Sequence, residues 1–103
     1  MKHYSFEGKH VLITGASGGL GVAMSKLLAE RGARLVVSSR SEKALSELIS
    51  KLPPDGDSVA ITADLSKPGE AERLTQAAIS ALGHIDVLIN NAGVGYFALM
   101  EEA

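Results

Sequence analysis

Cysteine and tryptophan are absent from this chain of 103 residues, which has only two tyrosines and two phenylalanines. Without cysteine the chain has neither a disulfide framework nor a thiolate metal site. No apolar run approaches the roughly 20 residues of a membrane-spanning helix, and residues 1–7 lack the apolar core of a signal peptide. The net charge is only −2, with lysine and arginine scattered, so the sequence has no nucleic-acid footprint. We expect a soluble cytoplasmic protein that binds neither nucleic acids nor membranes.

Four short apolar stretches alternate with three amphipathic stretches along the chain. Hydrophobic residues make up 46% of the sequence, which is enough for one globular domain spanning residues 1–103. The apolar stretches predict buried strands and the amphipathic stretches predict helices. The expected strands cover 10–14, 35–37, 59–62 and 85–89, and the expected helices cover 19–31, 42–52 and the stretch from an N-cap at Ser66 to Gly83.

This alternation predicts an α/β fold, a Rossmann-type parallel sheet with right-handed crossovers and helices on both faces. We expect the strand order 3-2-1-4, with the domain truncated after the fourth strand and a helix starting at residues 99–103. The direction of strand addition reverses between strands 1 and 4. Ligands of open α/β sheets bind at the carboxyl ends of the strands at such a reversal. The ligand site is therefore expected where the first strand ends.

A glycine-rich turn, Thr14-Gly15-Ala16-Ser17-Gly18-Gly19-Leu20-Gly21, joins the first strand to the first helix. Such a turn directs backbone N–H groups and the positive end of the helix dipole at one point, which suits a phosphate group. Glycine is needed where a Cβ would block the approach of a pyrophosphate, or of the helix to the strand. Tight packing without a ligand is the alternative explanation of the same glycines.

The turn reads T-G-x-x-x-G-x-G, which resembles the cofactor motif of the short-chain dehydrogenases/reductases. Two further stretches strengthen this resemblance: Ala63-Asp64-Leu65 after the third strand and Asn90-Asn91-Ala92-Gly93 after the fourth. The resemblance covers nearly the whole chain but less than half of a typical family member. It implies that this chain is the N-terminal cofactor-binding portion of such an enzyme.

The resemblance also implies a dinucleotide laid across the carboxyl edge of the sheet. In the family the glycine turn binds the pyrophosphate, the aspartate contacts the adenine ring, and the N-N-A-G motif lies beside a ribose. An asparagine of that motif also ties its strand to the threonine of the glycine turn, here Thr14. Capping of a helix, or solvation, is the alternative role of Asp64. The implied cofactor-binding residues are Gly15, Ser17, Gly18, Gly19, Leu20, Gly21, Asp64, Leu65, Asn91, Ala92 and Gly93.

Ser39 and Arg40 follow the second strand, and no Asp or Glu stands between Arg34 and Glu42. A carboxylate here would accept hydrogen bonds from the ribose 2′-OH of NAD, whereas an arginine suits the 2′-phosphate of NADP. The Arg40 guanidinium can pair with a phosphate through two hydrogen bonds, and the Ser39 hydroxyl can donate another. We therefore expect NADP(H) to be favoured over NAD(H). The alternative is that Arg40 is an exposed loop charge.

The catalytic residues of the family have no counterpart in this sequence. The resemblance implies general acid–base catalysis by the tyrosine of a Y-x-x-x-K motif, with hydride transfer between a nicotinamide and a carbonyl or alcohol. Four residues beyond Tyr4 and Tyr96 stand Gly8 and Met100 instead of lysine. Two functions remain open: the dinucleotide-binding half of an NADP(H)-dependent oxidoreductase, or a nucleotide-binding or structural module without catalysis of its own.

The fourth strand and the histidines lead to two further expectations. With no fifth strand beside it, the apolar strand 85–89 would expose unpaired backbone groups, which favours a homo-oligomer formed through this edge.

His3, His10 and His84 have no partners at metal-ligand spacing along the sequence, so we expect no metal site.

Overall fold

The computed structural model describes residues 6–91 and 96–99. Strands and helices alternate from the first strand to the fourth as expected, with a short 3-10 helix, η1, before the third strand. The elements are β1 (His10–Thr14), α1 (Gly19–Glu30), β2 (Arg34–Ser39), α2 (Glu42–Ser50), η1 (Pro54–Gly56), β3 (Val59–Thr62), α3 (Glu70–Leu82), β4 (Val87–Asn90) and β5 (Tyr96–Leu99).

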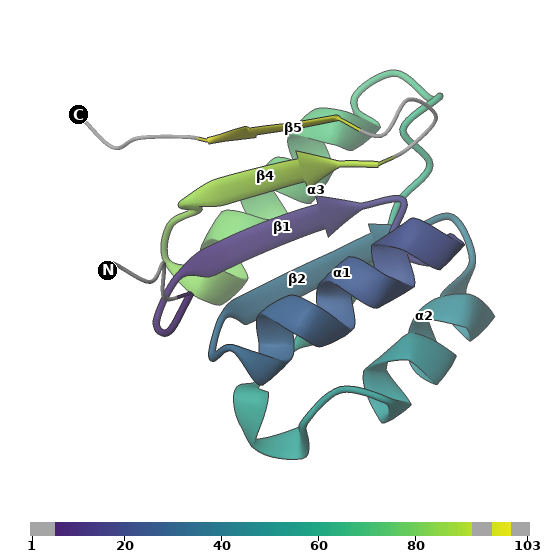
Figure 1. Cartoon of the computed structure of the whole chain (residues 1–103). Helices are drawn as coiled ribbons and strands as arrows, with labels where there is room; N and C mark the ends of the chain where they lie inside the picture. The colour runs from purple at the N-terminus through teal and green to yellow at the C-terminus, as the bar shows by residue number, and fades with distance from the viewer. Residues whose placement is uncertain (1–5, 92–95, 100–103) are drawn as a thin grey trace.

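The strands form one sheet in the order β3-β2-β1-β4-β5 (Figure 1). β1 pairs in parallel with β2 and with β4, and β2 pairs in parallel with β3. The Rossmann-type order 3-2-1-4 is therefore confirmed, and the reversal lies between β1 and β4. Because these four strands are parallel, their carboxyl ends meet at one edge of the sheet.

The sheet continues past β4 to a fifth strand that the sequence analysis did not expect. β5 runs antiparallel to β4, with Asn90 opposite Tyr96 and Val87 opposite Leu99. Only residues 91–95 separate the two strands, and so short a connection can join antiparallel neighbours but not parallel ones. Leu99 lies in this strand, which corrects the helix expected to start there. The expected unpaired edge of β4 is also wrong, because β5 is hydrogen-bonded to that edge.

Alternating side chains of the central strands build one apolar core on each face of the sheet. Val11 and Ile13 of β1 belong to the core with α1 and α2, whereas Leu12 belongs to the core with α3. Figure 1 shows α1 and α2 in front of the sheet and α3 behind it. Both faces are therefore covered, as expected for a parallel sheet. No helix in these described ranges has the length and apolar character of a membrane-spanning segment.

Gly21, rather than a large apolar residue, brings α1 onto the turn that follows β1. A Cβ added at Gly21 would lie 2.5 Å from the carbonyl oxygen of Gly15 and 2.7 Å from the Cα of Ala16. These are backbone atoms, which cannot swing aside as the end of a flexible side chain can. Because α1 turns Gly21 inward, the side chains of Leu20 and Leu27 point outward and are 58% and 49% exposed.

The substitution Gly21→Ala should lower the free energy of unfolding by about 1–3 kcal/mol, the usual cost of forcing extra volume into a packed interior. Gly19→Ala is the matched control, because a Cβ at Gly19 would have no atom within 4 Å. Urea denaturation followed by circular dichroism measures both free energies. Equal stability of the two variants would contradict the tight contact at Gly21.

Candidate functional site

A cleft of about 850 Å³ lies at the carboxyl ends of the parallel strands. This volume falls in the range of about 300–1,000 Å³ that is usual for small-molecule and cofactor sites. The cleft brings together the glycine turn, the end of β2, the loop after β3 and the residue after β4. The residues that were expected to bind a cofactor and that line the cleft are Gly15, Ser17, Gly18, Ser39, Arg40, Asp64, Leu65 and Asn91.

Other expected residues lie elsewhere. Gly19 and Leu20 begin α1 and are exposed, and Gly21 packs under the turn instead of lining the cleft. Ala92 and Gly93 lie outside the described residues. Sequence reasoning missed three hydroxyl residues of the cleft wall, although each stands beside an expected site residue at a strand end. They are Ser38, Ser41 and Ser66.

The glycine turn leaves the amino end of α1 without a side-chain cap. Gly15 has a φ of 63°, a left-handed conformation that glycine adopts readily. Gly18 occupies the N-cap position, and it has no side chain that could accept from the first-turn N–H groups. The first turn of α1 also contains no acidic residue. No residue of α1 therefore neutralises the positive end of the helix dipole. This end of the helix favours the binding of an anion.

Thr14 and Asn90 join β1 to β4 beside the cleft. The Thr14 hydroxyl donates a hydrogen bond of 2.8 Å to Asn90 Oδ1, and the backbone N–H of Asn91 donates to the Thr14 carbonyl at 3.2 Å. Thr14 is buried, with 5% of its surface exposed, so these bonds are sheltered from water. The expected tie between the fourth strand and the threonine is therefore present, and Asn90 provides it.

At the end of β2 the hydroxyl of Ser39 is hydrogen-bonded, whereas the guanidinium of Arg40 is exposed to solvent. Ser39 Oγ accepts the backbone N–H of Ser41 at 3.0 Å and reaches the carbonyl of the same residue at 3.4 Å. The Ser41 hydroxyl in turn accepts the N–H of Ala44, so Ser41 is the N-cap of α2. Arg40 is exposed, and among the residues placed by the structure it forms no ion pair.

Asp64 is held by Ser66 in the loop after β3. The backbone N–H and the hydroxyl of Ser66 both donate to Asp64 Oδ1, at 3.0 Å and 2.6 Å. These hydrogen bonds are the main reason that the pKa of Asp64 is lowered. The expected capping of the third helix by Ser66 is wrong, because its hydroxyl binds Asp64 and α3 starts only at Glu70. The N-cap of α3 is Gly69.

Glu70 and Arg73 brace the same loop from the first turn of α3. Glu70 Oε1 accepts the backbone N–H of Asp64 at 3.2 Å, while Oε2 pairs with Arg73 Nε at 2.7 Å. Arg73 Nη2 also donates to the carbonyl of Thr62, at 2.9 Å. The hydrogen bond from Arg73, followed by that from the Asp64 backbone, lowers the pKa of Glu70 to about 2. Sequence reasoning missed this pair, although its i,i+3 spacing was a visible signal.

Comparison with known proteins gives a consistent family. Residues 9–103 match the sequence family described as short chain dehydrogenase. The chain is 42% identical over 98 residues to an uncharacterised oxidoreductase of Methylorubrum extorquens, covering 93% of this chain and 40% of that protein. It is 37% identical over 99 residues to the rhamnolipids biosynthesis 3-oxoacyl-[acyl-carrier-protein] reductase of Pseudomonas aeruginosa, covering 96% and 39%. The chain thus spans about two fifths of the length of these relatives.

Solved structures share the fold. The Pseudomonas aeruginosa RhlG/NADP active-site complex superposes with a TM-score of 0.79 at 38% identity, covering 88% of this chain and 37% of that one. The 3-ketoacyl-(acyl-carrier-protein) reductase of Brucella melitensis complexed with NADH has a TM-score of 0.74 at 34% identity, covering 82% and 34%. One of these relatives holds NADP and the other NADH, so both dinucleotides occur among similar structures.

The carboxylate of Glu70 should stabilise the fold in a pH-dependent way. Its pKa is depressed from 4.5 to about 2, so its contribution is complete above pH 4.5 and is lost as the pH falls toward 2. The difference in unfolding free energy between the native chain and Glu70→Gln should therefore shrink over this interval. Urea denaturation at a series of pH values measures it, with Glu72→Gln on the same helix as control. If the difference in unfolding free energy between the native chain and Glu70→Gln does not change with pH, the contacts of Glu70 with Arg73 and Asp64 do not stabilise the fold.

Proposed function

Because this chain belongs to the short-chain dehydrogenase family, we propose that it is the N-terminal dinucleotide-binding portion of an oxidoreductase that favours NADP(H) over NAD(H). The observation that carries the proposal is the single cleft in which the glycine turn, Arg40 and Asp64 come together. The preference for NADP(H) rests on Arg40 and on the lack of a carboxylate at the end of β2.

The glycine turn is assigned to the pyrophosphate. The uncapped amino end of α1 offers N–H donors and a positive dipole end to an anion. A Cβ at Gly19 would meet no atom within 4 Å, so space is open on this side of the turn. A pyrophosphate can use that space to approach the backbone closely, which a larger residue would prevent.

The loop after β3 is assigned to the adenine ring. Asp64 uses Oδ1 for its two bonds with Ser66. Its other carboxylate oxygen can accept a hydrogen bond from an exocyclic amino group. Glu70 holds the backbone N–H of Asp64, which limits the movement of the carboxylate before the cofactor arrives. Leu65 supplies apolar surface in the same wall of the cleft.

Arg40 and Ser39 are assigned to the 2′-phosphate. Arg40 is exposed at the cleft and can form two charge-assisted hydrogen bonds with a phosphate. The hydroxyl of Ser39 donates only at 3.4 Å to Ser41, so its hydrogen can turn to a stronger acceptor. Arg40 would therefore distinguish NADP from NAD, while Ser39 would add one neutral hydrogen bond.

The chemistry of the whole enzyme needs more than these residues. A bound nicotinamide would supply or accept the hydride exchanged with a carbonyl or alcohol substrate. Asn91, with Ala92 and Gly93, is assigned to a ribose of the cofactor. The sequence has no Y-x-x-x-K motif, so we assign acid–base catalysis to residues of a longer protein. The alternative function is a nucleotide-binding module that performs no catalysis.

Arg40→Ala should weaken NADPH binding by roughly 10–100-fold, the equivalent of one strong charge-assisted contact, and leave NADH binding almost unchanged. Calorimetric titration of the chain with each cofactor measures this difference. Lys43→Ala is the matched control, because Lys43 is another exposed cation nearby in sequence that does not line the cleft. Equal losses for both cofactors would argue against a contact with the 2′-phosphate.

Gly19→Ala should weaken the binding of NADPH and of NADH alike, while the chain stays folded. The reason is that an added methyl group would occupy the space assigned to the pyrophosphate, although it touches no protein atom. Gly56→Ala serves as control, since a Cβ at Gly56 also meets nothing within 4 Å. If Gly19→Ala binds both cofactors as tightly as the native chain does, the pyrophosphate does not lie at this position.

A further inference from the structure

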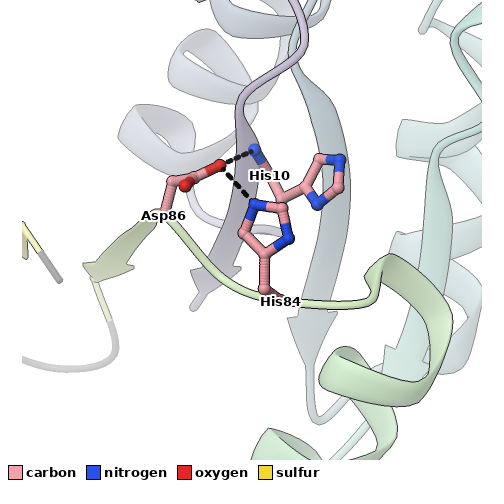
Figure 2. A group of neighbouring side chains, drawn as sticks. All are labelled: His10, His84 and Asp86. Atoms are coloured by element: carbon pink, nitrogen blue, oxygen red, sulfur yellow. Dashed lines mark hydrogen bonds and ion pairs between the residues drawn. The ribbon is translucent and has the colours of Figure 1, made fainter. Parts of the chain in front are cut away.

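Two histidines and an aspartate meet at the amino edge of the sheet, the edge opposite to the cleft. His10 is the first residue of β1, and His84 and Asp86 lie between α3 and β4. Each offers one ligand atom, and these atoms all lie within 4.8 Å of one another. Figure 2 shows the His84 ring pointing toward the Asp86 carboxylate, with the His10 ring lying beside the His84 ring. Spacing along the sequence gave no sign that His10 would lie beside His84 and Asp86.

One hydrogen bond from the backbone holds the carboxylate of this group, and a second joins the backbones of the same two residues. Asp86 Oδ2 accepts the backbone N–H of His10 at 2.8 Å, and the N–H of Asp86 donates to the His10 carbonyl, also at 2.8 Å. The two bonds connect the amino ends of β1 and β4. A metal-ligating carboxylate is usually oriented by such an outer hydrogen bond, and here that bond is already made.

The two imidazoles lie against each other beside the carboxylate. Their ring centroids are 4.2 Å apart, and His84 Nε2 is 3.1 Å from Asp86 Oδ2. His10 Nδ1 is buried and has no hydrogen-bond partner in the part of the chain that is placed. A buried nitrogen with an unused lone pair or proton is unfavourable, and coordination of a cation would satisfy it.

The ligand set and its spacing suit Zn²⁺. Imidazole nitrogens and carboxylate oxygens bind Zn²⁺ at about 2.0–2.2 Å, so ligand atoms in a tetrahedral centre lie about 3.3 Å apart. His84 Nε2 and Asp86 Oδ2 form a hydrogen bond of 3.1 Å, which a bound ion would replace at a similar separation of the two atoms. The His84 and Asp86 side chains are 44% and 26% exposed, so an ion can enter from solvent and keep a water molecule as its fourth ligand.

We propose that His10, His84 and Asp86 form a three-ligand site for Zn²⁺ that clamps the amino ends of β1 and β4. The ion would join residues from two segments that are already hydrogen-bonded to each other. Binding would therefore stabilise the pairing of the central strands. It would act at the edge of the sheet away from the dinucleotide cleft, so cofactor affinity need not change.

The test is titration of the chain with zinc chloride in a calorimeter, with cobalt(II) absorption and thermal unfolding as further readouts. We expect one ion per chain, a higher Tm, and the visible bands of four-coordinate cobalt. His84→Ala should weaken Zn²⁺ binding by about 100-fold or more, since loss of even an outer hydrogen bond of a metal ligand costs 10–100-fold. Asp55→Asn is the control, because Asp55 is an exposed carboxylate of η1 that does not belong to the group.

A second variant keeps the test decisive if His84→Ala unfolds. Asp86→Asn retains an oxygen that can accept the His10 N–H, yet it replaces the carboxylate with a much weaker metal ligand. It should stay folded by circular dichroism and lose Zn²⁺ affinity. The proposal is overturned if the native chain shows no saturable binding, if Asp86→Asn binds Zn²⁺ as tightly as the native chain does, or if Asp55→Asn loses as much affinity as Asp86→Asn.

Discussion

The cleft at the carboxyl ends of the strands depends on the contact between the backbone of α1 and the backbone of the turn that precedes it. At Gly21 the helix comes so close that a Cβ would lie 2.5 Å from the Gly15 carbonyl oxygen. This approach determines where α1 begins and leaves its uncapped amino end beside the cleft. The turn contains no charged residue, so its attraction for an anion comes from backbone N–H groups and the helix dipole.

β1 and β4 are joined by polar groups at both of their ends, in addition to their backbone pairing. At the carboxyl ends the Thr14 hydroxyl donates to Asn90, and at the amino ends the His10 N–H donates to the Asp86 carboxylate. The first bond lies beside the cleft, and the second lies within the proposed Zn²⁺ site. One pair of neighbouring strands therefore contributes residues to both sites, at opposite edges of the sheet.

Much of the fold and of the cleft was predictable, because each prediction used residues that are close together in sequence. Apolar stretches and helix periodicity located β1 to β4, and the parallel arrangement then required Arg40 and Asp64 to meet at one edge. β5 was not predictable in this way, because residues 96–99 become a strand by pairing with β4. The spacing of Glu70 and Arg73 was visible, but the Thr62 carbonyl that completes their brace was not.

The sequence by itself determined the order of the elements from β1 to β4, the position of the glycine turn, and the residue types available at the cleft. All of these follow from local periodicity and short motifs. Only the tertiary structure decided that His10 would lie against His84 and Asp86. His10 and Asp86 are 76 positions apart, and no spacing along the chain reports their contact. It arises because β1 and β4 pair in parallel, which brings the amino ends of two distant segments together.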